Sequence, residues 1–286
     1  MLVVFDCIEF NLEFRWIDHM ADLAFLLMDL EARGHQRWAN RCLNRYIEKS
    51  GDYKGFLLLP HYKSFRSMVR AKVAMLGEQP NLKEFRRYLD LTARYAEPAK
   101  PLLILMHGFS GSGKSHFAAK LAAEINAIEV RSAVERRRLY LEASKRGEEL
   151  ALYGGDMNMR THHRLSEITE VLLQAGQTVI LDATFIKQRT RRHFEQLAQR
   201  YKIPLRIIEC TAPDTVIRQR LKQREELDMD PSDANEAIYD KQLSIYDPLS
   251  DDERAFCLSL DTQSANSLER AIEQLSAQSL IVTARN

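Results

Sequence analysis

The residues with the most specific chemistry in this chain form the loop GFSGSGKS, residues 108 to 115. The spacing matches GxxxxGK followed by Ser or Thr, in which glycines allow successive backbone N–H groups to converge on phosphate oxygens. In such a loop Lys114 reaches the β and γ phosphates, and the hydroxyl of Ser115 ligates magnesium. We therefore expect this loop to bind ATP with Mg²⁺.

The sequence around the loop supports the same interpretation. LLILMH precedes it as a short apolar strand, and KSHFAAKLAAEINA follows it as a helix whose positive dipole end faces the anion. The residues expected to bind the nucleotide are those of the loop and the first helical turn: Gly108, Ser110, Gly111, Ser112, Gly113, Lys114, Ser115 and His116.

A carboxylate follows a second apolar strand, in TVILDAT, residues 178 to 184. In an open α/β sheet this places Asp182 at the carboxyl edge, where ligands bind. There it could hold magnesium together with Ser115, or orient the hydroxyl of a phosphate acceptor. The alternative is an Asp that only caps a turn at the strand end.

The stretch IEVRSAVERRRLY, residues 128 to 140, comes soon after the phosphate loop. The residues just beyond the second strand of such a sheet face the γ-phosphate from the acceptor side, so Ser132, Ala133 and Arg136 are candidate acceptor contacts. Glu135 is the nearest acid, but its position on the helix directs its side chain elsewhere.

Other basic and imidazole side chains in this region have a plainer interpretation. Arg137 and Arg138 are expected on a solvated helix face. His162 and His163 are adjacent on a helix and cannot face the same way, so we expect surface or capping residues and no shared metal.

A later helix, DTVIRQRLKQREE, carries Arg220 and Arg224 four residues apart and therefore on one face. These arginines could close over the nucleotide and neutralise charge on the transferred phosphoryl group. The alternative is an ordinary solvated helix face. The turn formers in LDMDPSDAN, residues 227 to 235, are suited to a hinge.

The overall composition limits the possible partners. The 286 residues include 41 basic and 40 acidic side chains, a net charge of +1, so nothing attracts the whole chain to nucleic acid or membrane. The longest apolar run, residues 23 to 28, is far shorter than the roughly 20 residues that span a bilayer. Four cysteines without a CxxC pair favour a reducing, cytoplasmic compartment over a disulfide or zinc site.

The order of the predicted elements indicates two domains. Residues 14 to 96 contain only helical patterns, and AEPAKP at 96 to 101 interrupts them with two prolines. Apolar strands then alternate with helices, at 102 to 107, 127 to 131, 178 to 182, 205 to 210 and 255 to 260. We predict an α/β P-loop NTPase fold with a five-stranded parallel sheet flanked by helices, residues 98–286, preceded by an all-α lobe, residues 1–97.

Residues of about 100 to 262 resemble the P-loop kinases of the zeta-toxin and polynucleotide-kinase-like family. The resemblance is carried by GFSGSGKS, RSAVERRR, VILDATF, the RxxxR of Arg220 and Arg224, and PSDA. It implies transfer of the γ-phosphoryl group of ATP to a hydroxyl. The family's second motif holds an Asp as general base, and the matching residue here is Ala133, so either the base was removed by engineering or Asp182 must replace it.

Residues of about 1 to 97 resemble the carboxyl-terminal lobe of aminoglycoside phosphotransferases. FDCIEFN and FRWIDHMADLAFLLMDL carry this resemblance. It implies a magnesium-binding Asp6 and a packing segment at 22 to 24. Since the catalytic HxD loop and the nucleotide-binding lobe of that family are missing, we expect a structural or substrate-shaping helical module.

The function expected from these features is that of an ATP-dependent kinase, a phosphotransferase with an alcohol group as acceptor. The acceptor would be a small molecule, a nucleotide or a nucleic-acid end, and the neutral net charge does not favour the last. The alternative is a nucleotide-binding regulatory module that transfers nothing.

Overall fold

The computed structural model describes residues 16–76, 78–98, 100–227 and 234–281, which form two compact units. One unit comprises residues up to Leu43 together with Lys54–Glu97, and the other comprises Asn44–Tyr53 together with the chain from Pro98 onward. Asp6, expected as a metal ligand, and most of the expected hinge, including PSD at 231 to 233, lie outside the described residues.

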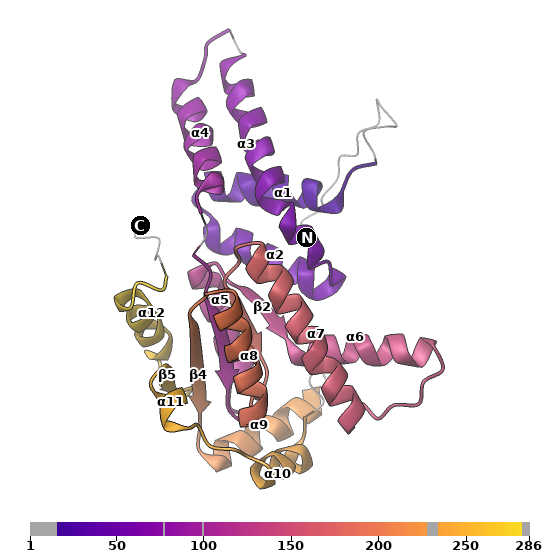
Figure 1. Ribbon diagram of the computed structural model, residues 1–286. Coiled ribbons are helices and arrows are strands. Elements are labelled where there is room, and N and C mark those ends of the chain that lie inside the picture. Colours follow the sequence, from indigo (N-terminus) through magenta and orange to yellow (C-terminus); the bar gives the residue numbers. More distant parts are fainter. Residues whose placement is uncertain (1–15, 77, 99, 228–233, 282–286) are drawn as a thin grey trace. The chain divides into compact units, whose positions relative to one another are not determined.

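The first unit is helical, as predicted for its described residues (Figure 1). Its α3 and α4 pack along each other, and α1 packs on α3. Met28, Ala71, Tyr88 and Leu91 form the buried core between these helices. The elements up to the end of this unit are α1 (His19–Ala32), α2 (Gln36–Ser50), η2 (Lys54–Leu57), α3 (Leu59–Met75) and α4 (Leu82–Ala96), of which α2 is divided between the two units.

The second unit contains the predicted sheet of five parallel strands, in the order β2-β3-β1-β4-β5. The central strand is buried along its whole length, which explains its uninterrupted apolar sequence. Arg131 and Asp182 are opposite each other at the ends of β2 and β3. The strands are β1 (Leu103–His107), β2 (Ile128–Arg131), β3 (Val179–Asp182), β4 (Leu205–Thr211) and β5 (Cys257–Asp261).

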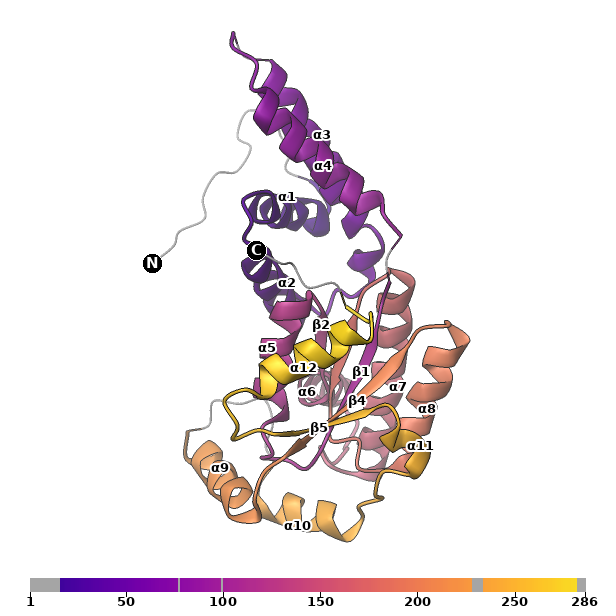
Figure 2. The ribbon, with the colours of Figure 1, turned by 90° about the vertical axis from the view of Figure 1, so that its left-hand side faces the viewer.

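Helices cover both faces of this sheet, with α5 and α12 on one and α7 and α8 on the other (Figure 2). The sequence patterns did not predict α10 and α11, because both are short and lie between turn-forming residues. The helices are α5 (Lys114–Ile125), α6 (Ser132–Lys145), α7 (Gly155–Gln174), α8 (Gln188–Arg200), α9 (Asp214–Leu227), α10 (Glu236–Ser244), α11 (Asp251–Arg254) and α12 (Ser267–Ala277). No described helix combines the length and apolar character needed to cross a membrane.

The end of α2 and the residues after it pack in the second unit. The side-chain amide of Asn44 continues the hydrogen bonding of the edge strand β2: its Nδ2 donates to the carbonyl of Ala127 (3.0 Å), and its Oδ1 accepts from the backbone N–H of Glu129 (2.7 Å). This contact satisfies backbone groups that an edge strand otherwise exposes.

A buried carboxylate fixes the same segment to α6. Glu135 is fully buried, and its Oε1 accepts a hydrogen bond from the hydroxyl of Tyr53 at 2.8 Å. Arg138 forms an ion pair with Glu135 and donates to the backbone carbonyl of Glu48 (3.1 Å). Glu135 therefore points away from Ala133, as predicted, whereas the expectation that Arg138 is solvated is wrong.

Arg191 on α8 holds the segment after β3 against the segment before β5. It is 1% exposed, and Glu253 accepts hydrogen bonds from its Nε (2.7 Å) and Nη2 (2.9 Å). Its remaining N–H groups donate to the backbone carbonyls of Phe185, Asp247 and Pro248. All five donors of the guanidinium group are thus satisfied inside the protein.

Replacing Arg191 should destabilise the protein strongly. In Arg191→Met the carboxylate of Glu253 stays buried without its counter-charge, and losing one partner of a buried pair costs about 3–5 kcal/mol. The free energy of unfolding measured in urea should fall by that amount. The control is Arg192→Met on the exposed side of the same helix, which should change stability by less than about 0.5 kcal/mol. Equal stabilities of the two variants would contradict this role.

Candidate functional site

The phosphate loop between β1 and α5 depends on glycines in backbone conformations that other residues rarely adopt. Gly108 has φ +133°, and a Cβ there would lie 2.5 Å from the carbonyl oxygen of Cys210 at the end of β4. Gly113, with φ +96°, precedes α5, and a Cβ there would lie 3.0 Å from Thr262, after β5. The loop backbone is therefore packed closely against the ends of β4 and β5.

Lys114 begins α5 and is almost completely buried. Its Nζ donates to the backbone carbonyl of Phe109 at 2.6 Å, within the same loop. Burial lowers the pKa of Lys114 to about 8, and the negative charge of Asp182 opposes this change. The negative charge that the protein provides near this ammonium group is thus too small to offset its burial, and a bound anion would supply the missing charge.

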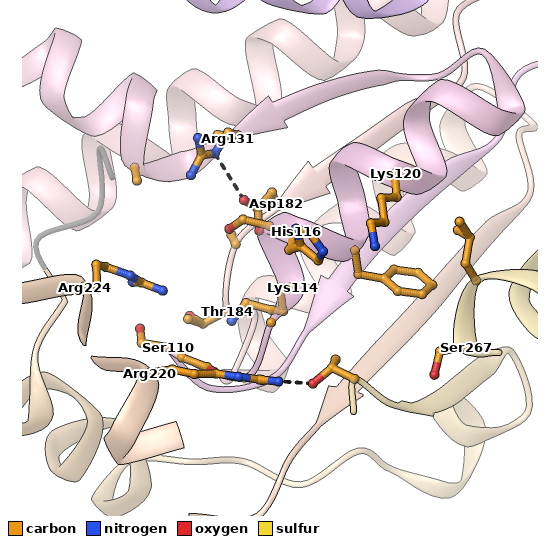
Figure 3. A pocket seen from close by; sticks show the side chains of 18 of the residues that line it. Ser110, Lys114, His116, Lys120, Arg131, Asp182, Thr184, Arg220, Arg224 and Ser267 are labelled. Carbon is orange, nitrogen blue, oxygen red and sulfur yellow. Dashed lines mark hydrogen bonds and ion pairs between the residues drawn. The ribbon is translucent and has the colours of Figure 1, made fainter. Parts of the chain in front are cut away.

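A cavity of about 380 Å³, the nucleotide cavity, opens over this loop (Figure 3). The predicted site residues that line it are Ser110, Gly111, Gly113, Lys114, Ser115, His116, Ala133, Asp182, Arg220 and Arg224. Gly108 and Ser112 are not among its lining residues. Ser112 is 1% exposed, and its backbone carbonyl accepts a hydrogen bond from Thr262 (2.7 Å). Gly108 and Ser112 therefore support the loop conformation and do not face the cavity.

Asp182 lies at the edge of the nucleotide cavity beside a basic residue that sequence reasoning missed. Its Oδ2 is 3.5 Å from Nε of Arg131, and both residues line the cavity. Arg131 also lies 3.6 Å from Oε1 of Glu48. The strand register that aligns Arg131 with Asp182 could have indicated this pair only after the strand order was known.

Arg220 and Arg224 both reach the nucleotide cavity from α9 (Figure 3). Nη1 of Arg220 donates to the hydroxyl of Thr262 at 3.1 Å, and Thr262 in turn donates to the carbonyl of Ser112. This position on the cavity wall favours a phosphate-binding role over the solvated-face alternative.

Further residues of the nucleotide cavity come from segments without a recognisable motif. They lie on α5, in the chain between β5 and α12, and in the first turn of α12: Phe117, Lys120, Thr262, Ser264, Ala265, Ser267 and Leu268. Gln242 on α10 was also missed. Its Oε1 accepts from the backbone N–H of Ser110, and its Nε2 donates to the hydroxyl of Ser110, both at 2.9 Å.

A second cavity of about 870 Å³ adjoins the first, and we call it the acceptor cavity after the role proposed for it below. Arg136 lines this cavity and not the nucleotide cavity, whereas Asp182 lines only the nucleotide cavity. Five residues line both and form what we call the seam: Ser110, Ser132, Ala133, Ala183 and Thr184. Two molecules bound in the two cavities would meet at the seam, where Ala133 lies.

Ser115 and Asp182 both line the nucleotide cavity and offer the hard oxygen ligands that Mg²⁺ prefers. Among the described residues no group of three or more His, Cys, Asp or Glu side chains could hold a metal ion alone. The pair therefore fits magnesium bound together with phosphate oxygens and water, as in other nucleotide sites.

A family model described as an AAA domain (AAA_33) matches residues 103–249, more than half of the chain. The chain belongs to this AAA domain family. The matched region begins at β1, includes the phosphate loop and Asp182, and ends after α10. It therefore contains the whole seam and most residues of both cavities.

Relatives of this AAA domain protein occur in mycobacteria. The uncharacterized proteins Rv2004c of Mycobacterium tuberculosis and Mb2027c of Mycobacterium bovis are each 30% identical to it over 227 residues, or 77% of this chain. The match covers 46% of each relative, so the chain spans about half of their length.

Solved structures with a similar arrangement include two kinases. A sugar kinase from Janibacter sp. HTCC2649 has a TM-score of 0.47 and 22% identity, over 64% of this chain and 99% of that one. The Mycobacterium tuberculosis APS kinase CysC, in complex with AMPPNP and APS, has a TM-score of 0.48 and 18% identity, over 63% of this chain and 99% of that one.

Binding of ATP should be accompanied by proton uptake at Lys114. Because burial lowers its pKa to about 8, the side chain is mostly neutral above that pH, and a bound polyphosphate would raise the pKa again. Calorimetry in buffers of different ionisation enthalpy should show uptake approaching one proton per ATP near about pH 9, and less toward pH 7.

Lys114→Arg is the matched control, since a guanidinium group stays protonated throughout this range. The uptake should disappear in this variant. If the parent protein and the Arg variant take up the same number of protons at every pH, Lys114 is not the group that titrates on binding.

Proposed function

We propose that this protein is an ATP-dependent kinase that transfers the γ-phosphoryl group to a hydroxyl of an acceptor bound in the acceptor cavity. The observation that supports this most is the seam, because a reaction between two bound molecules needs two adjoining cavities with a common boundary. The resemblance of residues 100 to 262 to zeta-toxin and polynucleotide-kinase-like enzymes points to the same reaction.

In this proposal the cations of the nucleotide cavity bind and orient the triphosphate. Backbone N–H groups of the glycine loop and Lys114 hold the β and γ phosphates, while Arg220 and Arg224 neutralise charge that develops on the transferred group. Arg131, beside Asp182, adds a further positive charge. Positioning and electrostatic stabilisation by such groups carry most of phosphoryl transfer.

Ser115 and Asp182 would hold the magnesium ion, which supplies charge neutralisation at the phosphate oxygens when it is bound. Asp182 lines the nucleotide cavity and not the acceptor cavity, which favours this role over orientation of the acceptor hydroxyl. A carboxylate beside Arg131 is also a poor candidate for the base that Ala133 does not provide.

We propose that Ala133 occupies the general-base position and that transfer by this chain is slow for that reason. A general base typically contributes about 10²- to 10⁴-fold to a rate. Its loss leaves nucleotide binding and acceptor positioning intact, because those depend on other residues. Arg136, one turn along α6 from Ala133, would contact the acceptor.

The remaining features are also proposals. The acceptor is a small molecule or a nucleotide, and a nucleic-acid end is not favoured by the net charge of +1. Residues 1–97, which resemble the aminoglycoside phosphotransferase lobe, would act as a structural module. Residues 98–286 would form the kinase domain. The compartment would be the cytoplasm.

A second candidate function is a nucleotide-binding regulatory module. It is favoured by one observation: among the described residues that line the two cavities, Asp182 is the only carboxylate, and it is paired with Arg131. Such a module would bind ATP tightly and change a protein partner or its own conformation on binding, without transferring phosphate.

Ala133→Asp should raise the rate of phosphoryl transfer by about 10²- to 10⁴-fold, because it supplies a general base at the seam. The measurement is transfer of label from γ-labelled ATP to a metabolite and RNA pool, together with the Kd for ATP, which should change by less than about threefold. The isosteric control Ala133→Asn fills the same space without a basic group and should stay at the parent rate.

Lys114→Ala provides the baseline for this experiment. If Ala133→Asp labels nothing that Lys114→Ala does not, the kinase proposal fails. A nucleotide-dependent complex in a pull-down with the parent chain would then support the regulatory module.

A further inference from the structure

The wall of the acceptor cavity carries a group of basic side chains from three helices. We call Arg136 on α6, His162 on α7, and Arg189 and His193 on α8 the cationic cluster. His162 and Arg136 are partly buried, while Arg189 and His193 reach the cavity from its exposed side. The cluster lies outside the nucleotide cavity, and phosphate binding at the glycine loop does not account for it.

Arg136 is held in a defined position without a counter-charge. Its guanidinium carbon lies 4.9 Å from the centre of the Tyr153 ring, and its Nε is buried without a hydrogen-bond partner. No described carboxylate lies within ion-pair distance of it. Burial consequently lowers the pKa of Arg136, although the side chain remains charged. A buried donor of this kind is costly unless a ligand satisfies it.

His162 experiences the same positive surroundings. Its Nδ1 is buried without a hydrogen-bond partner. Burial, together with the charges of Arg136, His193 and Arg189, lowers the pKa of His162 to about 4. The prediction that His162 is a surface or capping residue is therefore wrong. His163 also lines the cavity, but its side chain is 75% exposed beside Glu167.

No acidic side chain in the described part of the cavity lining offsets the charges of Arg136 and Arg189. Two further cations, Lys187 and Lys241, also line it. Lys187 is 3.3 Å from Asp247, but Asp247 is not among the lining residues. Positive potential inside a concave, low-dielectric site concentrates anions there.

We infer that the acceptor of this enzyme carries an oxyanion group, such as a phosphate ester or a carboxylate, which the cationic cluster binds while the reacting hydroxyl lies at the seam. The inference rests on the proposed kinase function and narrows its substrate class. Ala133 and Arg136 are three residues apart on α6, so their Cβ atoms are only about 5–6 Å apart. A small molecule can therefore reach both, and a cavity of about 870 Å³ accommodates one.

The test is anion binding by the full chain in the presence of saturating AMPPNP and Mg²⁺, which occupy the glycine loop. Inorganic phosphate, and acetate in a separate arm, are titrated while the histidine side-chain resonances are recorded by NMR. We expect the resonances of His162 to shift with phosphate or acetate, and its pKa to rise because the anion adds negative charge beside it. Tighter binding of phosphate indicates that the acceptor carries a phosphate ester, and tighter binding of acetate indicates that it carries a carboxylate.

Arg136→Gln should weaken this binding by at least about tenfold, since a charge-assisted hydrogen bond to the anion is lost. Arg137→Gln is the matched control, because Arg137 is the next residue on α6, is exposed and does not line the cavity. Failure of both anions to shift His162 at millimolar concentration, or equal affinities in the two variants, would overturn the inference.

A comparison of acceptors separates this inference from the kinase proposal. Glycerol and glycerol 3-phosphate, glucose and gluconate are offered with γ-labelled ATP to Ala133→Asp. If anions bind at the cluster but label is transferred neither to these acceptors nor to the metabolite and RNA pool, the kinase function is refuted. The cluster is then an anion-binding site without phosphoryl transfer. Transfer with no preference for the anionic member of either pair refutes the inference alone.

Discussion

The contact between the backbone at Gly108 and the carbonyl of Cys210 is the constraint on which the rest of the site depends. Because there is no room for a side chain, the phosphate loop lies directly against the end of β4. Thr262, after β5, then bonds to the carbonyl of Ser112 and to Arg220. Loop, sheet edge and α9 are thereby joined, and the cations around Lys114 face one cavity.

The parallel sheet brings the other half of the site to the same edge. The ends of β2 and β3 lie side by side, so Arg131 and Asp182 form one boundary of the nucleotide cavity. The residues that follow these strands, Ala133 and Thr184 among them, form the seam with the acceptor cavity. Arg191 holds the chain after β3 in place through its buried pair with Glu253. The seam thus depends on tertiary contacts well outside it.

Sequence reasoning recovered what is encoded locally and missed what depends on distant contacts. The glycine loop and the five strands could be predicted, because residues within each short segment determine its conformation. Gln242 forms hydrogen bonds with Ser110, which is 132 residues away in the sequence, and no sequence motif predicts such a contact. The burial of His162 depends on how α6 and α8 pack around α7. The sequence of α7 alone therefore predicts a surface or capping residue at this position. Residues 44–53 pack in the second unit through contacts such as those of Asn44, although residues 44–50 continue a helix that begins in the first.

The central claim is that ATP occupies the nucleotide cavity with its γ-phosphate directed at the seam. A crystal structure of the chain with AMPPNP and Mg²⁺ tests it most directly. We predict that Nζ of Lys114 leaves the carbonyl of Phe109, which it contacts at 2.6 Å, and binds the β and γ phosphates, with the γ-phosphate beside Ala133. A nucleotide seated in the acceptor cavity, or a triphosphate directed away from the seam, would contradict the account.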